Sequence, residues 1–268
     1  MKILGLAHGQ IGDQFIQLPL VRHLKNTIPD LFYCANVNYK YSAAASILRW
    51  CNYIDGIYIS DSYDKFPSVA DLAFLQNSGI DKLYNPMPSH KDEKWWKIRH
   101  QTQEVFHQYE FPVPDAPLQI EIPINQTEFW PQVIAIAPFG GSGASYKSIP
   151  MEKSKRIVDF CKELGYTVIQ LGGLSEPTID GAIKINGFYE DAVKMMIASR
   201  LFITVDTGLC WCASGFKKNL IGLYANEYYT PEFVKNIQPV NPNATYLDAK
   251  SIAHISDDLI FEVIKNKI

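Results

Sequence analysis

Short, nearly continuous apolar runs alternate along the chain with segments in which apolar residues recur every three to four positions. Residues 2–7 form the first run, and residues 15–28 form the first segment with helical spacing. A continuous apolar run is typical of a strand buried on both faces, whereas helical spacing predicts an amphipathic helix. Because the two patterns alternate, the sequence predicts an α/β fold with a parallel sheet.

The same alternation occurs on both sides of a proline-rich stretch. Before it we expect strands at 31–35 and 56–59 and a helix at 43–53, and after it strands at 133–137, 167–171 and 201–205 and helices at 151–164, 191–199 and 255–267. The stretch at 112–132 contains five prolines, a composition typical of a connector or an edge segment. We therefore expect two α/β halves that face a cleft at the loop ends of their strands.

Composition and charge narrow the class of protein further. Of the 268 residues, 47% are hydrophobic and 20% are charged, which is an ordinary globular balance. The formal net charge of −3 provides no basic surface for nucleic acid phosphates. The five cysteines lie in apolar runs, as expected of reduced, buried thiols. Without a targeting segment or a run of about 20 apolar residues, the protein is expected to be cytoplasmic.

A glycine-containing turn, Gly9-Gln10-Ile11-Gly12-Asp13, follows the first predicted strand. Glycines let a backbone turn tightly and approach a ligand closely. A carboxylate at the start of the next helix could act as general base for a hydroxyl nucleophile, or it could cap the helix. Both interpretations of Asp13 remain open. The spacing is not G-x-G-x-x-G, so it gives little support for a nicotinamide cofactor.

A second glycine-rich loop, residues 140–147, follows the predicted strand at 133–137. Its backbone N–H groups and Ser142 could surround phosphate oxygens while Lys147 adds a positive charge. The alternative is a flexible surface loop with a solvated lysine, because lysines are mostly exposed. The loop lacks P-loop spacing, so ATP hydrolysis is not supported.

A third turn, Asp206-Thr207-Gly208, leads from a predicted strand into a predicted helix. A helix N-terminus is an anion site suited to a diphosphate, although a simple helix cap explains the same residues. Glu176 follows another glycine turn and could accept hydrogen bonds from ribose hydroxyls, or it could be an ordinary exposed glutamate. The sequence contains no D-x-D triplet and no clear metal site, so we expect neither a metal nor a cofactor.

The order and spacing of these motifs resemble the bacterial heptosyltransferases of glycosyltransferase family 9. The motifs are Gly12-Asp13 with Leu18-Pro19, Lys147 with Pro150, and Asp206-Thr207-Gly208, and Gly172-Gly173 with Glu176 supports them. The resemblance implies a GT-B fold, in which two Rossmann-like domains face a central cleft. It implies an acceptor-side domain at residues 1–125 and a nucleotide-sugar-binding domain at 126–268.

The resemblance also implies roles for individual residues. Asp13 would be the catalytic base, Lys147 would stabilise the departing diphosphate, and Glu176 would hold the ribose. Trp211 stands where the family commonly has a histidine that meets the donor. The full set of implied donor-binding residues is Gly9, Gln10, Gly12, Ser142, Glu176, Asp206, Thr207, Gly208 and Trp211.

The function implied is an inverting, metal-independent glycosyltransferase. It would move a sugar from a nucleotide diphosphate donor to a glycan, lipopolysaccharide or other lipid-linked acceptor, with peripheral contact at the inner membrane face. Two alternatives from other classes are a catalytically degenerate sugar-nucleotide-binding protein and a GT-B sugar-nucleotide epimerase. Product formed from the donor alone would identify the epimerase, because a transferase requires an acceptor.

Overall fold

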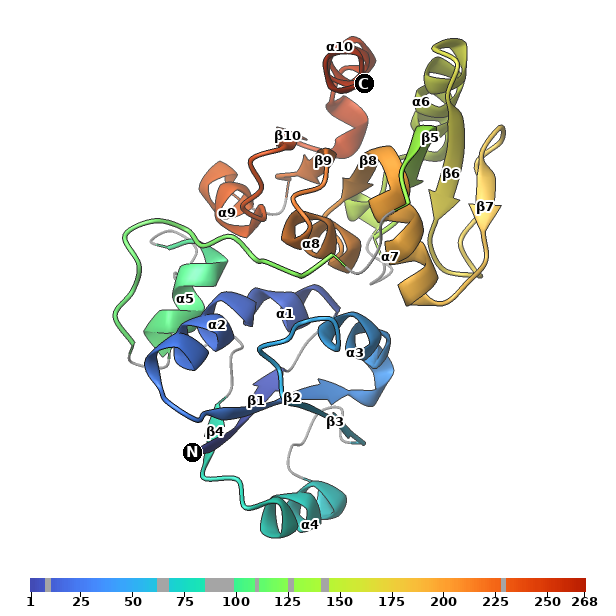
Figure 1. Cartoon of the computed structure of the whole chain (residues 1–268). Coiled ribbons are helices and arrows are strands. Elements are labelled where there is room, and N and C mark those ends of the chain that lie inside the picture. Colours follow the sequence, from blue (N-terminus) through green and yellow to red (C-terminus); the bar gives the residue numbers. More distant parts are fainter. Residues whose placement is uncertain are drawn as a thin grey trace. The chain divides into compact units, whose positions relative to one another are not determined.

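The computed structural model describes residues 1–7, 11–61, 68–84, 99–108, 111–124, 128–140, 145–227 and 230–268. The chain divides into two compact units, Met1–Pro123 and Ile124–Ile268 (Figure 1). Each unit is built on a parallel sheet with helices, which confirms the predicted α/β class. The division falls within the proline-rich stretch, at residue 123 where we expected residue 125. The cleft that the sequence predicts between the two halves depends on how the units are placed relative to one another, so it stays a prediction.

The first unit holds a four-stranded sheet in the order β3-β2-β1-β4, with every pair parallel. Its strands are β1 Lys2–Ala7, β2 Phe32–Asn38, β3 Gly56–Ser60 and β4 Lys82–Tyr84, and its helices are α1 Ile11–Ile16, α2 Leu18–Thr27, α3 Ala43–Leu48, α4 Val69–Ser78 and α5 Gln101–Gln108. The strands predicted at 2–7, 31–35 and 56–59 are confirmed within a few residues. Strand β4 and helices α4 and α5 were not predicted from the sequence.

Two predicted helices of this unit were wrong in extent. The helix expected at 15–28 is interrupted at Gln17, and two helices, α1 and α2, take its place. Pro19 lies in the first turn of α2, where its missing N–H leaves no helical hydrogen bond unmade, so the proline marks a helix start. The helix expected at 43–53 ends at Leu48, and the chain continues through turns closed by Cys51 and Ile54.

The second unit holds a six-stranded sheet in the order β10-β9-β8-β5-β6-β7, again entirely parallel. Its strands are β5 Trp130–Ala137, β6 Thr167–Leu171, β7 Ile183–Ile185, β8 Ser199–Val205, β9 Leu220–Ala225 and β10 Ala244–Ala249, and its helices are α6 Met151–Glu163, α7 Tyr189–Ala198, α8 Gly208–Gly215, α9 Pro231–Ile237 and α10 Asp257–Lys267. Counted along the unit, this is the 3-2-1-4-5-6 order of dinucleotide-binding folds. The direction of winding therefore reverses between β5 and β8.

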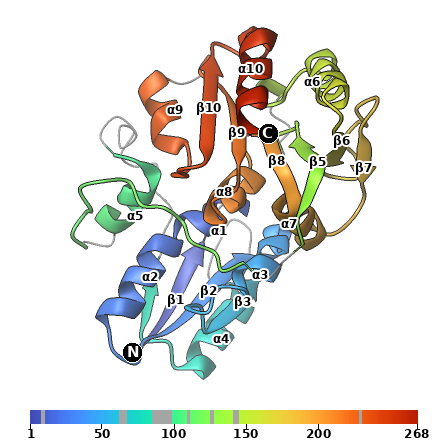
Figure 2. The same cartoon turned by 45° about the horizontal axis from the view of Figure 1, so that its top comes forward.

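Helices cover both faces of this sheet (Figure 2). Alternate residues of β5, β8 and β9, such as Ile134, Ile203 and Leu223, pack with α6 and α10 in one buried cluster. Helices α7 and α8 contact β8 and each other on the remaining face. Because both faces are covered, the strands are almost continuously apolar, which is why the sequence pattern identified β5, β6 and β8.

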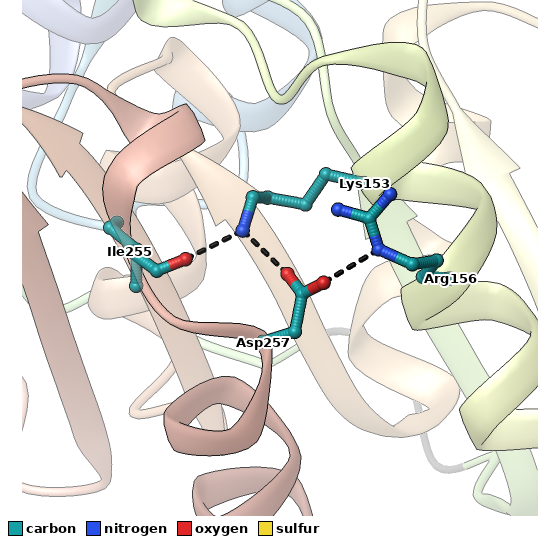
Figure 3. Close-up of polar contacts among 4 residues, drawn as sticks. All are labelled: Lys153, Arg156, Ile255 and Asp257. Atoms are coloured by element: carbon teal, nitrogen blue, oxygen red, sulfur yellow. Dashed lines mark hydrogen bonds and ion pairs between the residues drawn. The ribbon is translucent and has the colours of Figure 1, made fainter.

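A charged network joins α6 to the start of α10 (Figure 3). Lys153 Nζ lies 2.5 Å from both the Ile255 carbonyl oxygen and Asp257 Oδ1, and Arg156 Nε lies 2.6 Å from Asp257 Oδ2. The Lys153 side chain is only 5% exposed. A buried ammonium group needs such partners, so this network fixes how the two helices pack.

Candidate functional site

The carboxyl ends of β5, β6 and β8 each lead into a polar loop of the second unit. In a parallel sheet these ends share one edge, and ligands bind beyond it where the winding reverses. The reversal between β5 and β8 brings together the loops that carry Lys147 and Asp206. The topology therefore identifies a candidate binding site independently of any sequence motif.

An ion pair joins the two loops at this point. Lys147 ends a short 3₁₀ helix, Ser145–Lys147, and its Nζ lies 2.6 Å from Oδ2 of Asp206, the residue directly after β8. Their side chains are 25% and 19% exposed, so both remain accessible to a ligand. The pair holds the ammonium group at the switch point. Lys147 is thus not the fully solvated surface lysine of the alternative interpretation.

A small pocket opens beside this pair, with an empty volume of about 240 Å³ that includes the part open to solvent. It is lined by Tyr146, Lys147, Asp206, Leu223, Tyr224, Ala225, Ile237 and Ile252. The sequence analysis did not identify the apolar part of this lining. Its residues come from β9, α9 and the turn before α10, which are far apart in the sequence and share no motif. Lys147 and Asp206 supply the charged groups of this lining.

Thr207 caps α8, because its Oγ1 accepts a hydrogen bond from the Cys210 backbone N–H at 3.3 Å. The cap and the anion site are compatible interpretations. The first turn of a helix has further N–H groups without intrahelical partners, and its dipole places positive charge there. The α8 N-terminus thus adds positive potential directly after Asp206.

Glu176 lies in the loop after β6, packed against the backbone of Gly172. A Cβ atom on Gly172 would lie 1.9 Å from Glu176 Oε2. Burial raises the pKa of this carboxyl, while the Gly173 backbone N–H and the charge of Lys184 act in the opposite direction. Oε2 is buried and has no hydrogen-bond partner within the part of the chain that the structure describes. The half-buried carboxylate therefore has acceptor capacity to offer a hydroxyl ligand.

Asp13 lies in the first unit, in the first turn of α1. The helix begins at Ile11, so Asp13 is its third residue and does not occupy the N-cap position. The side chain is partly exposed and Gly12 is buried. A carboxylate in the first turn interacts favourably with the helix dipole. Gly9, Gln10 and Ser142 lie outside the described residues.

Trp211 lies inside α8 and is only 4% exposed. Little of its surface is therefore available to a donor in this structure. Cys210 and Cys212 flank it and are buried free thiols. Among the residues the structure describes, no group of three or more His, Cys, Asp or Glu side chains is placed to hold a metal ion. Nor does any described helix have the length and apolarity needed to cross a membrane.

Solved structures with the same fold include three that match almost the whole chain. The family 9 glycosyltransferase from Veillonella parvula DSM 2008 has a TM-score of 0.76 and 16% identity, over 99% of this chain and 96% of that one. E. coli ADP-heptose lipopolysaccharide heptosyltransferase II has a TM-score of 0.73 and 14% identity, over 99% and 98%. E. coli heptosyltransferase WaaC, solved with ADP, has a TM-score of 0.71 and 11% identity, over 100% of both.

No protein-family model matches the sequence, and no curated protein matches it either. The similarity thus lies in the arrangement of the elements, at identities of 11–16%. The fold expected from the sequence motifs is the fold observed. The chain therefore has the fold of the glycosyltransferase family 9 and heptosyltransferase structures.

Proposed function

We propose that the chain is a glycosyltransferase that takes a sugar from a nucleotide diphosphate donor. The observation that carries this proposal is the Lys147–Asp206 pair at the switch point, next to the N-terminus of α8. Positive charge at the end of a helix suits a diphosphate. The fold similarity supports the proposal, since one neighbour, E. coli heptosyltransferase WaaC, was solved both with ADP and with ADP-2-deoxy-2-fluoro heptose.

The proposed reaction is a direct displacement at the anomeric carbon of the donor. Asp13 takes the proton of an acceptor hydroxyl, whose oxygen forms the new bond to the anomeric carbon. The bond from that carbon to the diphosphate oxygen breaks, and the diphosphate leaves with the electron pair. Attack comes from the face opposite the leaving group, so the configuration inverts.

In the proposed reaction, residues of the second unit stabilise the charge of the leaving group. Lys147 and the α8 N-terminus stabilise the negative charge that develops on the departing diphosphate, and Asp206 holds the lysine ammonium group in place. Removing a single group of this kind typically costs about 10²–10³ in rate. Because the protein itself supplies this positive charge, the proposed reaction uses no metal ion.

The other donor contacts follow from the same arrangement. Glu176 would accept hydrogen bonds from the ribose, because an acidic residue after the second strand has this role in dinucleotide-binding folds. Gly9, Gln10, Gly12, Ser142, Thr207 and Gly208 complete the proposed donor site. Trp211, at 4% exposure, packs inside α8 and is left out of it. The first unit would bind the acceptor, a glycan or a lipid-linked lipopolysaccharide, from the cytoplasmic side of a membrane surface.

The experiment is transfer by the purified full chain, with a panel of nucleotide sugars and a lipopolysaccharide core acceptor. Asp13→Asn should bind the donor as the wild type does but lose about 10²–10⁴-fold in transfer, the usual contribution of a general base. Asp115→Asn, an exposed carboxylate of the same unit, is the matched control and should transfer normally.

Three other outcomes would contradict the role of Asp13 or favour a different function. Full activity of Asp13→Asn would contradict the base role. Nucleotide binding without transfer or hydrolysis by the wild type would favour the degenerate binding protein. A product formed from the donor alone would favour the epimerase.

A further inference from the structure

Two exposed apolar side chains lie beside the proposed ribose contact. Phe188 is 85% exposed and Leu174 is 79% exposed, whereas the other exposed large hydrophobic residues that the structure describes reach at most 59%. Leu174 belongs to the loop after β6, and Phe188 follows β7. Because β6 and β7 pair in parallel, both residues lie at the same edge of the sheet as Glu176.

The backbone that carries these side chains is anchored. Lys184 Nζ, on β7, donates to the carbonyl oxygens of both Leu174, at 3.1 Å, and Glu176. The Phe188 backbone N–H donates to Asp191 Oδ2 at 3.0 Å and fixes the start of α7. Phe188 thus occupies an N-cap position, which normally carries Ser, Thr, Asp or Asn. A phenyl ring at this exposed position contributes nothing to the cap.

We propose that Phe188 and Leu174 form the surface on which the base of the nucleotide donor rests. The inference depends on the proposed function, which places the diphosphate between β5 and β8. The ribose then lies at Glu176, after the second strand of the unit. A base extending further along the same edge reaches the third strand, β7, and the loop that carries Phe188.

The chemistry of the two side chains defines how the base is bound. Both are hydrocarbon, so they offer stacking and apolar contact without hydrogen bonds to the base edge. Stacking on an aromatic ring tolerates any base, since every base has a π face. This surface therefore adds affinity for nucleotides in general, and selection among bases would have to come from other groups.

The test is calorimetric titration of the full chain with ADP, UDP and inorganic pyrophosphate, which lacks a base. Phe188→Ala should weaken ADP and UDP binding by about 5- to 150-fold, the range for loss of one base–aromatic stack. Pyrophosphate binding should not change. Phe188→Trp should keep the wild-type affinity, and Leu174→Ala should show a smaller loss of the same kind.

Phe129→Ala is the matched control, because Phe129 is 57% exposed in the same unit. It directly precedes β5, so it lies at the amino ends of the parallel strands, opposite the carboxyl ends that carry Phe188 and Leu174. Its nucleotide affinity should equal that of the wild type. Since the Phe188 ring is exposed, Phe188→Ala should also keep the wild-type thermal midpoint.

Unchanged ADP and UDP affinity of Phe188→Ala would overturn this inference and leave the proposed function standing. An equal loss for pyrophosphate would also overturn it. If the wild type binds neither ADP nor UDP, the proposed function fails, and this inference fails with it.

Discussion

Replacing Asp257 by alanine removes the carboxylate that joins α6 to α10 (Figure 3). The variant leaves the Lys153 ammonium group, whose side chain is 5% exposed, with its hydrogen bond to the Ile255 carbonyl oxygen. Removing one partner of a buried ion pair costs about 3–5 kcal/mol, mainly because a charge stays buried and uncompensated. The Asp257 side chain is 27% exposed, so water can partly replace it. We therefore expect a loss of about 3 kcal/mol, the lower end of that range.

Two matched variants separate the buried charge from the pair itself. Lys153→Met removes the ammonium group and keeps an apolar stem, so it should cost about 1 kcal/mol, the worth of an ordinary hydrogen bond. Arg156→Ala breaks the pair at a side chain that is 51% exposed and should cost at most about 1 kcal/mol. The expected order of destabilisation is Asp257→Ala first, followed by the other two.

Urea unfolding monitored by circular dichroism measures these differences, and the thermal midpoint of Asp257→Ala should fall by about 10 °C. Burial tends to raise the pKa of the Asp257 carboxyl, but hydrogen bonds from Arg156 and Lys153 outweigh it and hold the pKa below its usual value. The carboxylate therefore contributes stability above the ordinary aspartate pKa of about 3.9, and this contribution is lost as the pH falls through the lowered value. If Lys153→Met costs as much as Asp257→Ala, the loss does not come from an uncompensated charge on Lys153.

Two further predictions concern glycine and cysteine positions. Gly172→Ala should weaken nucleotide binding with little change in the free energy of unfolding, because the new Cβ would push aside the flexible end of the Glu176 side chain. Calorimetric titration measures the change in affinity. Gly173→Ala should bind normally, since its Cβ would lie 3.6 Å from the nearest atom, Glu176 Oε1. All five cysteines are buried and free, and burial raises the pKa of Cys34 to about 11 and that of Cys161 to about 12. Thiol labelling at neutral pH should therefore be slow until denaturant is added, and fast labelling of the native protein would contradict this.

Most strands that are buried on both faces were predictable from the sequence, although the equally buried β9 was not identified. β1, β5, β6 and β8 each contain a nearly continuous apolar run, and each was identified to within a few residues. β4 and β7 have only three residues each, which is too short to establish a period. Helix α4 carries apolar residues around its circumference, so helical spacing gave no signal there.

Pro131 shows why local composition misled in one place. It suggested a connector or an edge strand, yet it lies at the second residue of β5, in the middle of the six-stranded sheet. The pairing with β8 shifts register between Trp130 and Ile134, so the missing N–H falls where the ladder is irregular. Proline excludes a regular paired position, but it does not exclude the start of a central strand.

The candidate site was predictable as separate motifs only. Lys147 and Asp206 are 59 residues apart, and nothing in either motif indicates that they form an ion pair. Their contact follows from the strand order, which places β5 beside β8, and strand order depends on how the whole unit packs. The exposure of Phe188 likewise depends on where α7 begins. The sequence suggested that this helix starts at residue 191, whereas it starts at Tyr189, which makes Phe188 the N-cap residue.

The proposed function requires a nucleoside diphosphate to bind at the Lys147–Asp206 pair. The most direct measurement is titration of ADP, GDP and UDP into the wild type and into Lys147→Met, with Lys155→Met as control. Lys155 is also paired with aspartates of the same unit, but on the exposed side of α6. We expect the wild type to bind nucleotides and Lys147→Met to weaken this binding by about 10- to 150-fold, the worth of a hydrogen bond to a charged group. Lys155→Met should leave the affinity unchanged. Equal affinity of the wild type and Lys147→Met, or no binding of any of the three nucleotides, would show that the pair is not the diphosphate site.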